Sequence, residues 1–213
     1  MCGALAQLYA MQGDFGAARQ HYRQEVSLLS DLDVSRDSAS TSIDSARVEM
    51  LAGDLEAAER LLRRDDAELA GMGERYFRST VVGMLARVLL LGQRSDEAEG
   101  FVVLAEALSD ADDASSQVLW RSTRALLLAA EHPERALELA RQSVDLAATT
   151  TDLALQGDAR VDLAEVLVAQ GDPDGARGCL GEARGLYERK GDVTSAARVT
   201  ARLGELAPES QDV

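Results

Sequence analysis

The sequence predicts an all-α protein: a right-handed superhelical solenoid of about five antiparallel helical hairpins, with a period of 39–40 residues, followed by a terminal helix. Two observations predict this class. A turn-like segment recurs five times along the 213 residues at nearly constant spacing. Between the turns, apolar residues follow a helical period, and the chain is rich in Ala and Leu but has only 4% aromatic residues and three prolines.

The recurring segment reads QGDFGAA, AGDLEAA, LGQRSDEA, AEHPERA and QGDPDGA. The corner residues taken as equivalent, at steps of 40, 39, 39 and 40, are Gly13, Gly53, Gly92, Glu131 and Gly171. Glycine permits the positive φ with which a helix often ends, and the Asp that often follows can cap the next helix. Small residues that would let paired helices approach closely come next, namely Ala18, Ala58, Ala98, Ala136 and Ala176. Each segment therefore predicts the corner of a helical hairpin.

Eleven helices follow from these corners, in pairs and then one alone. We expect them at residues 2–12, 15–31, 36–52, 55–71, 75–91, 95–109, 113–130, 133–148, 152–170, 173–189 and 193–206. The repeat domain is expected to span residues 1–206, with a polar tail at 207–213. The first helix has no capping residue before it and is shorter than its equivalents, so we expect a truncated first hairpin and a longer parent protein.

The charge of the chain excludes several functions. The formal net charge is −15, which predicts no nucleic-acid partner and no anionic membrane partner. Lys190 is the only lysine and lies in Arg189-Lys190-Gly191, so the chain has no Walker A motif. The longest apolar stretch, Val81 to Leu91, is too short to span a bilayer, and no secretory segment is present. A cytoplasmic location is the expectation.

Catalytic and metal-binding residues are not predicted. The two cysteines, Cys2 and Cys179, are far apart, and the two histidines, His21 and His132, belong to no metal-binding motif. The acidic run at residues 110–113 lacks the Gly and Glu that a calcium loop requires. We therefore expect no enzyme activity, no cofactor and no metal site.

The corners and the residues around them resemble the tetratricopeptide repeat. In the first unit the residues that carry this resemblance are Leu5, Ala6, Tyr9, Gly13 and Ala18. In the fifth unit they are Leu163, Ala164, Leu167, Gly171 and Ala176. The match departs at Ser45 and Glu49, which occupy core positions, at the extra residue after Gly92, and at Glu131. The resemblance implies a helical repeat that binds protein or peptide partners.

A closer resemblance covers most of the chain. Segments 72–82, 116–128, 157–167 and 186–198 look like the C-terminal repeat region of actinobacterial multidomain regulators. In those proteins an ATPase module precedes the repeats, together with a nucleotide-cyclase domain or a LuxR-type or other DNA-binding domain. The resemblance implies a non-catalytic regulatory module whose partner is a protein, a peptide or the ATPase domain of a parent chain.

The inner surface of the solenoid is the candidate binding site, because stacked hairpins line it with the first helix of each pair. The repeat frame predicts a concave surface formed by Gln7, Arg47, Arg121, Arg124, Asp158, Glu165 and Glu205. Ala86 and Ala125 share this frame and would leave room for a partner. The candidate aromatic anchors are Tyr76, Phe77 and Trp120. The competing interpretation is that the charged residues are simply solvated.

Two other functions stay open. In the first function the chain is a small-ligand or peptide sensor, and the nearest candidates for lining its pocket are Trp120, Arg121 and Arg124. In the second function it is a stand-alone adaptor that pairs with another copy through Leu5, Leu8 and Tyr9 to give a homodimer.

Overall fold

The computed structural model describes residues 2–31 and 35–207; for residues 29–42 only the backbone is considered. Every regular element in these ranges is a helix. The elements are α1 (Cys2–Met11), α2 (Phe15–Asp31), α3 (Ser35–Ala52), α4 (Leu55–Met72), α5 (Tyr76–Leu91), α6 (Ser95–Leu108), α7 (Ala114–Leu128), α8 (Pro133–Ala148), α9 (Leu153–Ala169), α10 (Pro173–Lys190) and α11 (Val193–Glu205). The predicted all-α class is confirmed, and every predicted helix boundary lies within two residues of the observed one. Residues 208–213 of the predicted polar tail lie outside the described residues.

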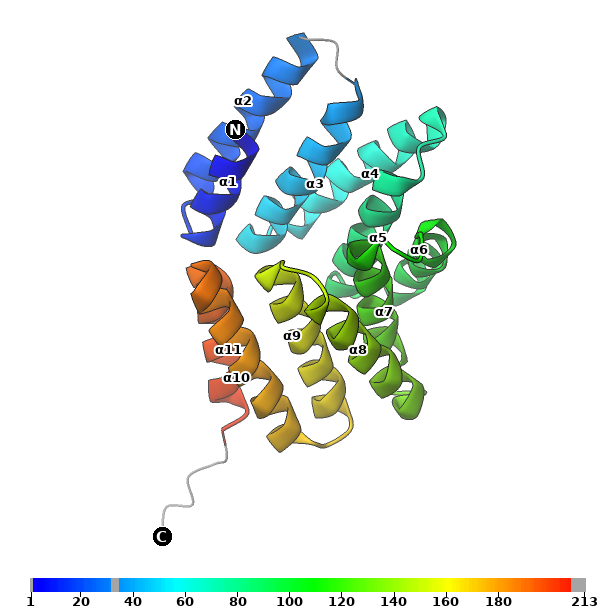
Figure 1. Cartoon of the computed structure of the whole chain (residues 1–213), viewed down its shortest axis with the longest axis vertical. Helices are drawn as coiled ribbons and strands as arrows, with labels where there is room; N and C mark the ends of the chain where they lie inside the picture. Colours follow the sequence, from blue (N-terminus) through cyan, green and yellow to red (C-terminus); the bar gives the residue numbers. More distant parts are fainter. Residues whose placement is uncertain (1, 32–34, 208–213) are drawn as a thin grey trace.

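The helices form five antiparallel hairpins, and each hairpin packs against the next. Within the chain, α1 pairs with α2, α3 with α4, and so on to α9 with α10, while α1, α3, α5, α7 and α9 also pack on one another in that order (Figure 1). The first, second and fifth corners have glycine at positive φ, at Gly13, Gly53 and Gly171. Asp54 and Asp172 then cap the following helices, accepting hydrogen bonds from Ala57 N at 3.0 Å and Gly175 N at 2.9 Å.

The third corner corrects the predicted repeat frame. Gly92 has φ −79° and is the C-cap of α5, whereas Gln93 takes the left-handed conformation with φ 61°. The equivalent of Gly13 and Gly53 is therefore Gln93, and the first three corners are 40 residues apart. The helix after each corner begins two residues later in all three units, which supports the revised frame. The inward position of the third hairpin consequently moves from Ala86 to the next residue, Arg87.

The core of the array is built where neighbouring helices meet. The five small residues that follow the corners are completely buried, as close helix packing requires: Ala18, Ala58, Ala98, Ala136 and Ala176. Large apolar side chains such as Leu62, Leu85 and Leu139 fill the spaces between successive helices, in consecutive clusters along the chain. Each hairpin therefore buries its apolar face against its neighbours, as expected for a repeat array.

Glu49, one of the departures from the repeat pattern, is buried with polar partners. Its side chain is only 3% exposed and accepts hydrogen bonds from Arg19 Nε, at 3.0 and 3.1 Å, and from the hydroxyl of Tyr22. Burial and the adjacent Glu49 raise the pKa of Tyr22 to about 12. The carboxylate is tolerated in the core because α2 supplies both a cation and a hydroxyl to it.

The two ends of the array meet, so the hairpins form a closed ring (Figure 1). Thr194 Oγ1, in the first turn of α11, donates to the carbonyl oxygens of Ala10 at 2.9 Å and Met11 at 3.1 Å at the end of α1. Gln12 Nε2 donates to Gly191 O at 2.8 Å, and Arg198 Nη2 donates to Leu51 O at the end of α3. We call this junction the seam. It joins carbonyl-rich helix ends to the amino end of α11, an arrangement that helix dipoles favour.

Candidate functional site

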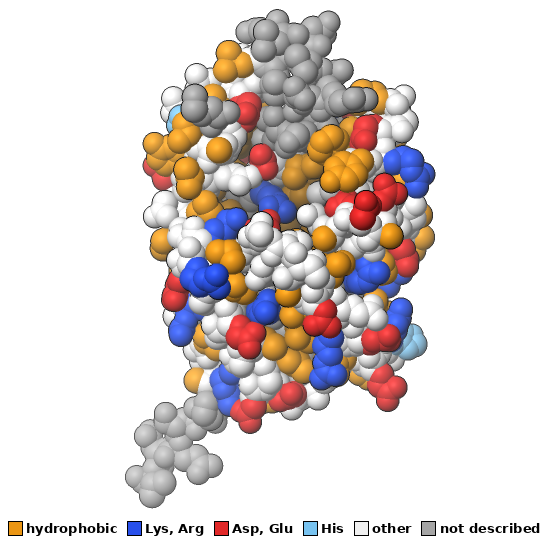
Figure 2. Space-filling model, in the orientation of Figure 1, with side chains coloured by type: hydrophobic (Ala, Val, Ile, Leu, Met, Phe, Trp, Pro, Cys, Tyr) orange, Lys and Arg blue, Asp and Glu red, His pale blue; other side chains and the backbone are white. Residues whose placement is uncertain are grey.

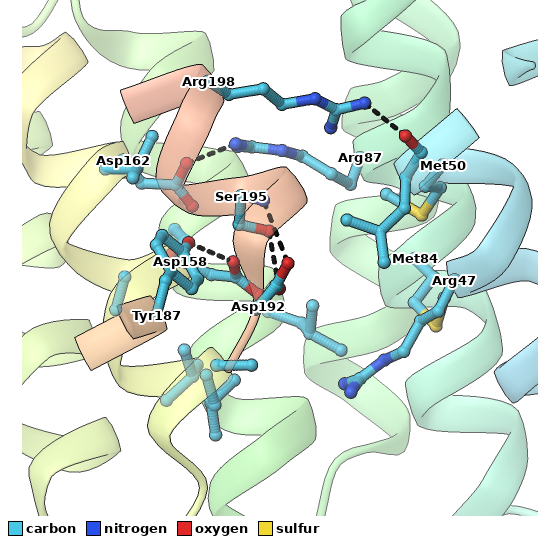
Figure 3. Close-up of a pocket in the computed structure, with 18 of the residues that line it drawn as sticks. Arg47, Met50, Met84, Arg87, Asp158, Asp162, Tyr187, Asp192, Ser195 and Arg198 are labelled. Atoms are coloured by element: carbon cyan, nitrogen blue, oxygen red, sulfur yellow. Dashed lines mark hydrogen bonds and ion pairs between the residues drawn. The ribbon is translucent and has the colours of Figure 1, made fainter. Parts of the chain in front are cut away.

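The ring encloses a central cavity of about 330 Å³, which falls in the size range of small-molecule sites. Its walls come from all six odd-numbered helices and from the end of α10. The polar and charged residues that line it are Gln7, Arg47, Arg87, Ser122, Thr123, Asp158, Asp162, Tyr187, Lys190, Asp192, Ser195 and Arg198. Figure 3 draws 18 of the lining residues, and the ten that it labels reach toward the cavity from opposite sides.

The repeat frame explains which side chains point inward. Gln7, Arg47 and Arg87 each lie six residues before a corner, on α1, α3 and α5. Ser122 and Asp162 lie nine residues before their corners, on α7 and α9. Positions three or four residues apart share one face of a helix, so both sets face the centre of the ring.

Arg87 and Asp162 form an ion pair that joins α5 to α9 across the cavity (Figure 3). The Asp162 side chain is only 7% exposed, and this burial raises its pKa although Arg87 acts in the opposite direction. The nearby Ser122 also acts to lower the pKa of Asp162. The Ser122 hydroxyl itself is buried and makes no hydrogen bond of standard geometry. Nη1 of Arg87 is also buried without a hydrogen-bond partner. A buried donor without a partner is costly, so this nitrogen has unused capacity to bind an acceptor.

A second polar pair lies one turn earlier on α9, where Asp158 meets Tyr187 of α10. The hydroxyl of Tyr187 donates to Oδ1 of Asp158 at 2.6 Å, and Asp158 is open to the cavity. Desolvation by the surrounding protein raises the pKa of Asp158. Burial and the neighbouring Asp158 carboxylate raise the pKa of Tyr187. Gly157 makes room for the tyrosine, since a Cβ atom there would lie 2.7 Å from the ring.

The remaining basic side chains of the wall differ in how they are neutralised. Lys190 forms an ion pair with Asp152 at 3.1 Å. Arg198 donates to a backbone carbonyl across the seam and has no carboxylate partner among the described residues. Arg47 extends into the cavity, and in residues 2–31 and 35–207 no hydrogen bond or ion pair engages it (Figure 3). Its longer-range field acts to lower the pKa values of three carboxyl groups, those of Asp44, Asp152 and Asp158.

The structure divides the predicted concave residues into three places. Gln7, Arg47 and Asp158 line the central cavity. Arg121 and Arg124 instead lie over the ring of Trp120, with guanidinium carbons 4.2 and 5.5 Å from its centre.

Glu165 and Glu205 lie apart from the cavity, on α9 and α11, where both form ion pairs with Arg202, at 2.8 Å each. Arg87 and Asp162 are cavity residues that the sequence reasoning missed. A one-residue shift of the third corner identifies Arg87.

The predicted aromatic anchors are exposed to different degrees. Tyr76 is 54% exposed at the start of α5 and contacts Phe77 edge to face, with ring centres 5.4 Å apart. Phe77 is half-buried, and Trp120 is buried with its Nε1 donating to Gln117 Oε1 at 3.2 Å. Of the three, Tyr76 offers the most surface to a partner. Near the N-terminus, Leu5, Leu8 and Tyr9 of α1 are also exposed.

The outer surface carries both signs of charge. On the face shown in Figure 2, acidic and basic side chains are interspersed and no large block of one sign is present. In the part of the chain that the structure describes, no group of three or more His, Cys, Asp or Glu residues is arranged to hold a metal ion. None of the described helices is both long and apolar enough to cross a membrane.

The tetratricopeptide repeat family model matches three segments of the chain, residues 2–24, 40–64 and 157–182. These three segments are similar to the tetratricopeptide repeat. Repeats of this kind form protein-interaction modules and are generally non-catalytic. No curated protein matches the chain in sequence.

Solved structures show the same fold at low sequence identity. A putative kinesin light chain from Podosopora anserina with nearly identical TPR-like repeats is 20% identical, with TM-score 0.55 and coverage of 89% of this chain and 94% of that one. BtubC from P. vanneervenii is 18% identical, with TM-score 0.62 and coverage of 100% and 83%. A signal-transduction ATPase with numerous domains and a tetratricopeptide repeat sensor, from Pyrococcus horikoshii, is 14% identical with TM-score 0.61. This chain aligns over 94% of its own length with 30% of that ATPase.

Proposed function

We propose that this chain is a non-catalytic regulatory module that forms the C-terminal part of an ATPase-containing signalling or transcription regulator. The observation that carries the proposal is the closed ring, in which the first and last hairpins meet around a central cavity. A ring that opens and closes at one junction is a two-state element, and a partner that prefers one state shifts the balance between them.

The seam is the weakest junction of the ring. It rests on side-chain-to-backbone hydrogen bonds from Thr194, Gln12 and Arg198, and the last two side chains are exposed. Such bonds contribute about 0.5–1.5 kcal/mol each. The junctions between successive hairpins instead bury apolar side chains such as Leu85 and Leu139 completely. The ring should therefore open at the seam before any other junction separates.

Two likenesses support the regulatory part of the proposal. The sequence segments at 72–82, 116–128, 157–167 and 186–198 resemble the repeat regions of bacterial multidomain regulators. The fold is also shared with the ATPase from Pyrococcus horikoshii, whose repeats are described as a sensor. In the proposed parent protein, docking of the ring on the ATPase, or of a partner on the ring, would alter ATP turnover.

The test begins with the native polypeptide. An antibody to this region should detect a band far above 22.8 kDa in the source cell, and the purified polypeptide should hydrolyse ATP. Replacing Thr194 by Val in that polypeptide should change the rate of ATP hydrolysis, whereas replacing the exposed Thr200 by Val should not. A native band at 22.8 kDa, or an ATPase rate indifferent to the seam, contradicts the proposal.

A second candidate function is a small-ligand or peptide sensor, and the central cavity favours it. The cavity is lined by several charged side chains and is enclosed by the ring, as a ligand site requires. The two functions are compatible, because a ligand that fills the cavity would stabilise the closed ring.

A further inference from the structure

We propose that the central cavity binds a small monocarboxylate with an apolar body, and that Arg47 is the residue that binds its carboxylate. The inference rests on the proposed function, because it names the class of molecule that a regulatory ring of this kind would sense. It is carried by the charge balance of the cavity wall, by unused hydrogen-bond donors and by the apolar remainder of the lining.

The basic side chains of the wall exceed their carboxylate partners. Four of them line the cavity: Arg47, Arg87, Lys190 and Arg198. Arg87 and Lys190 are each paired with a carboxylate, and Arg198 is bound to a backbone carbonyl. Within the described residues Arg47 has neither, although its side chain reaches into the cavity (Figure 3). Arg87 also retains a buried Nη1 without an acceptor.

The acidic side chains of the wall are already engaged. Asp162 accepts from Arg87, and Asp158 accepts from Tyr187. Asp192 caps α11, where it accepts from the backbone nitrogen of Ser195 at 2.9 Å and from its hydroxyl at 2.7 Å. Each acidic side chain of the wall thus already accepts at least one hydrogen bond, whereas the guanidinium of Arg47 and Nη1 of Arg87 have no acceptor among the described residues, and an occupant with a negatively charged acceptor matches them.

The charge of that occupant is limited to one. Asp158 and Asp162 remain in the wall and would repel a dianion such as phosphate, while one unpaired guanidinium neutralises one carboxylate. A carboxylate also matches the planar fork of an arginine, which donates two parallel hydrogen bonds to it.

The rest of the lining is apolar. Met50, Met84, Val118, Leu119 and Leu155 come from four different inner helices and face the same space. Burying a hydrocarbon chain or ring against them is favourable by about 25 cal/mol per Å² of apolar surface. The volume of about 330 Å³ suits a small molecule better than a folded segment of a partner protein.

Titration calorimetry tests the proposal with three six-carbon probes, hexanoate, 1-hexanol and hexylamine, and with inorganic phosphate. Hexanoate should bind the full chain and raise its melting temperature, and the other three should bind much more weakly. Arg47→Gln should weaken hexanoate binding about 10- to 100-fold, the loss expected for a charged hydrogen bond. Arg60→Gln is the matched control, because Arg60 is exposed on α4 and does not line the cavity.

Several results would overturn the proposal. The chain could bind hexanol as tightly as hexanoate, or bind phosphate or hexylamine more tightly than hexanoate. Arg47→Gln could leave the affinity for hexanoate unchanged. Hexanoate could also fail to bind at about 10 mM, a concentration that detects even millimolar affinity. Circular dichroism establishes that the Arg47→Gln chain is folded, and Arg47→Lys should keep part of the affinity because it keeps the charge. The size of the parent protein and the effect of Thr194→Val on its ATPase rate are both measured without ligand. Failure of the regulatory proposal can therefore be told apart from failure of carboxylate binding.

Discussion

Replacing Arg87 by Met should destabilise the ring and make its stability strongly dependent on pH. The substitution keeps the length and much of the apolar volume of the side chain but removes the cation that neutralises Asp162. Asp162 is then left in the wall with its side chain 7% exposed and with Ser122 nearby to help stabilise its charge. Removing one partner of a buried ion pair costs about 3–5 kcal/mol. For a chain of this length that corresponds to a fall in Tm of about 6–20 °C.

The direction of the pH dependence follows from the pKa of Asp162. Burial already raises this pKa above its ordinary value, and Arg87 opposes the rise. A carboxyl group whose pKa is higher in the folded than in the unfolded state stabilises the fold below the unfolded value, about pH 4, and loses that contribution as pH rises through the folded value. Without Arg87 the folded pKa rises further. The deficit of the variant should therefore be small near pH 4 and largest at neutral pH.

Urea unfolding followed by circular dichroism at pH 4, 5, 6 and 7 measures this deficit. Arg60→Met is the control, because Arg60 and Glu56 are both exposed and their closest N–O distance is 4.0 Å. That control should change stability by less than about 0.5 kcal/mol at every pH. A deficit for Arg87→Met below about 1 kcal/mol, or one that does not vary with pH, would refute the assignment of a buried pair across the cavity.

Two further predictions concern the packing of the ring. Arg19→Met should lower the free energy of unfolding by about 3 kcal/mol, because it leaves the buried Glu49 carboxylate without its cation. Adding Glu49→Leu should restore most of that loss, as measured by a double-mutant cycle in urea. Strictly additive effects of the two substitutions would contradict the pairing. Gly157→Ala should cost about 1–3 kcal/mol because its Cβ would meet the Tyr187 ring, whereas Gly178→Ala, with no atom within 4 Å, should gain about 0.5–1 kcal/mol; equal effects on Tm would contradict the packing described.

The fold was predictable because the corners have strong local chemistry. Gly13, Gly53 and Gly171 take the positive φ that glycine accepts, and Asp54 and Asp172 cap the helices that follow. These signals lie within a few residues of one another and do not depend on distant contacts, so the helix boundaries were predicted to within two residues.

The third corner shows where local chemistry misleads. Gly92 is the residue that sequence reasoning places in the left-handed conformation, yet Gln93 takes it with φ 61°. The common period of the array and the start of α6 set this position, against the preference of the residue itself. The one-residue error placed Ala86 at the inward position and left Arg87 out of the predicted site.

The rest of the cavity depends on contacts that no local pattern encodes. Arg87 and Asp162 are 75 residues apart, and Thr194 meets Ala10 across 184 residues. Their meeting follows from the accumulated curvature of five hairpins, which brings the ends of the chain together. A repeat period predicts that hairpins stack but does not predict how many complete one turn.

The distance between α1 and α11 tests the central claim, which is that the ring is closed. Spin labels at Leu8 and Thr200, in a chain whose two cysteines are replaced by serine, report this distance by pulsed electron paramagnetic resonance; both label positions are exposed. A closed ring predicts one narrow distribution that broadens and lengthens when Thr194→Val and Arg198→Met are combined. A broad distribution in the otherwise unmodified chain, unchanged by those substitutions, would show that the ends do not meet in solution.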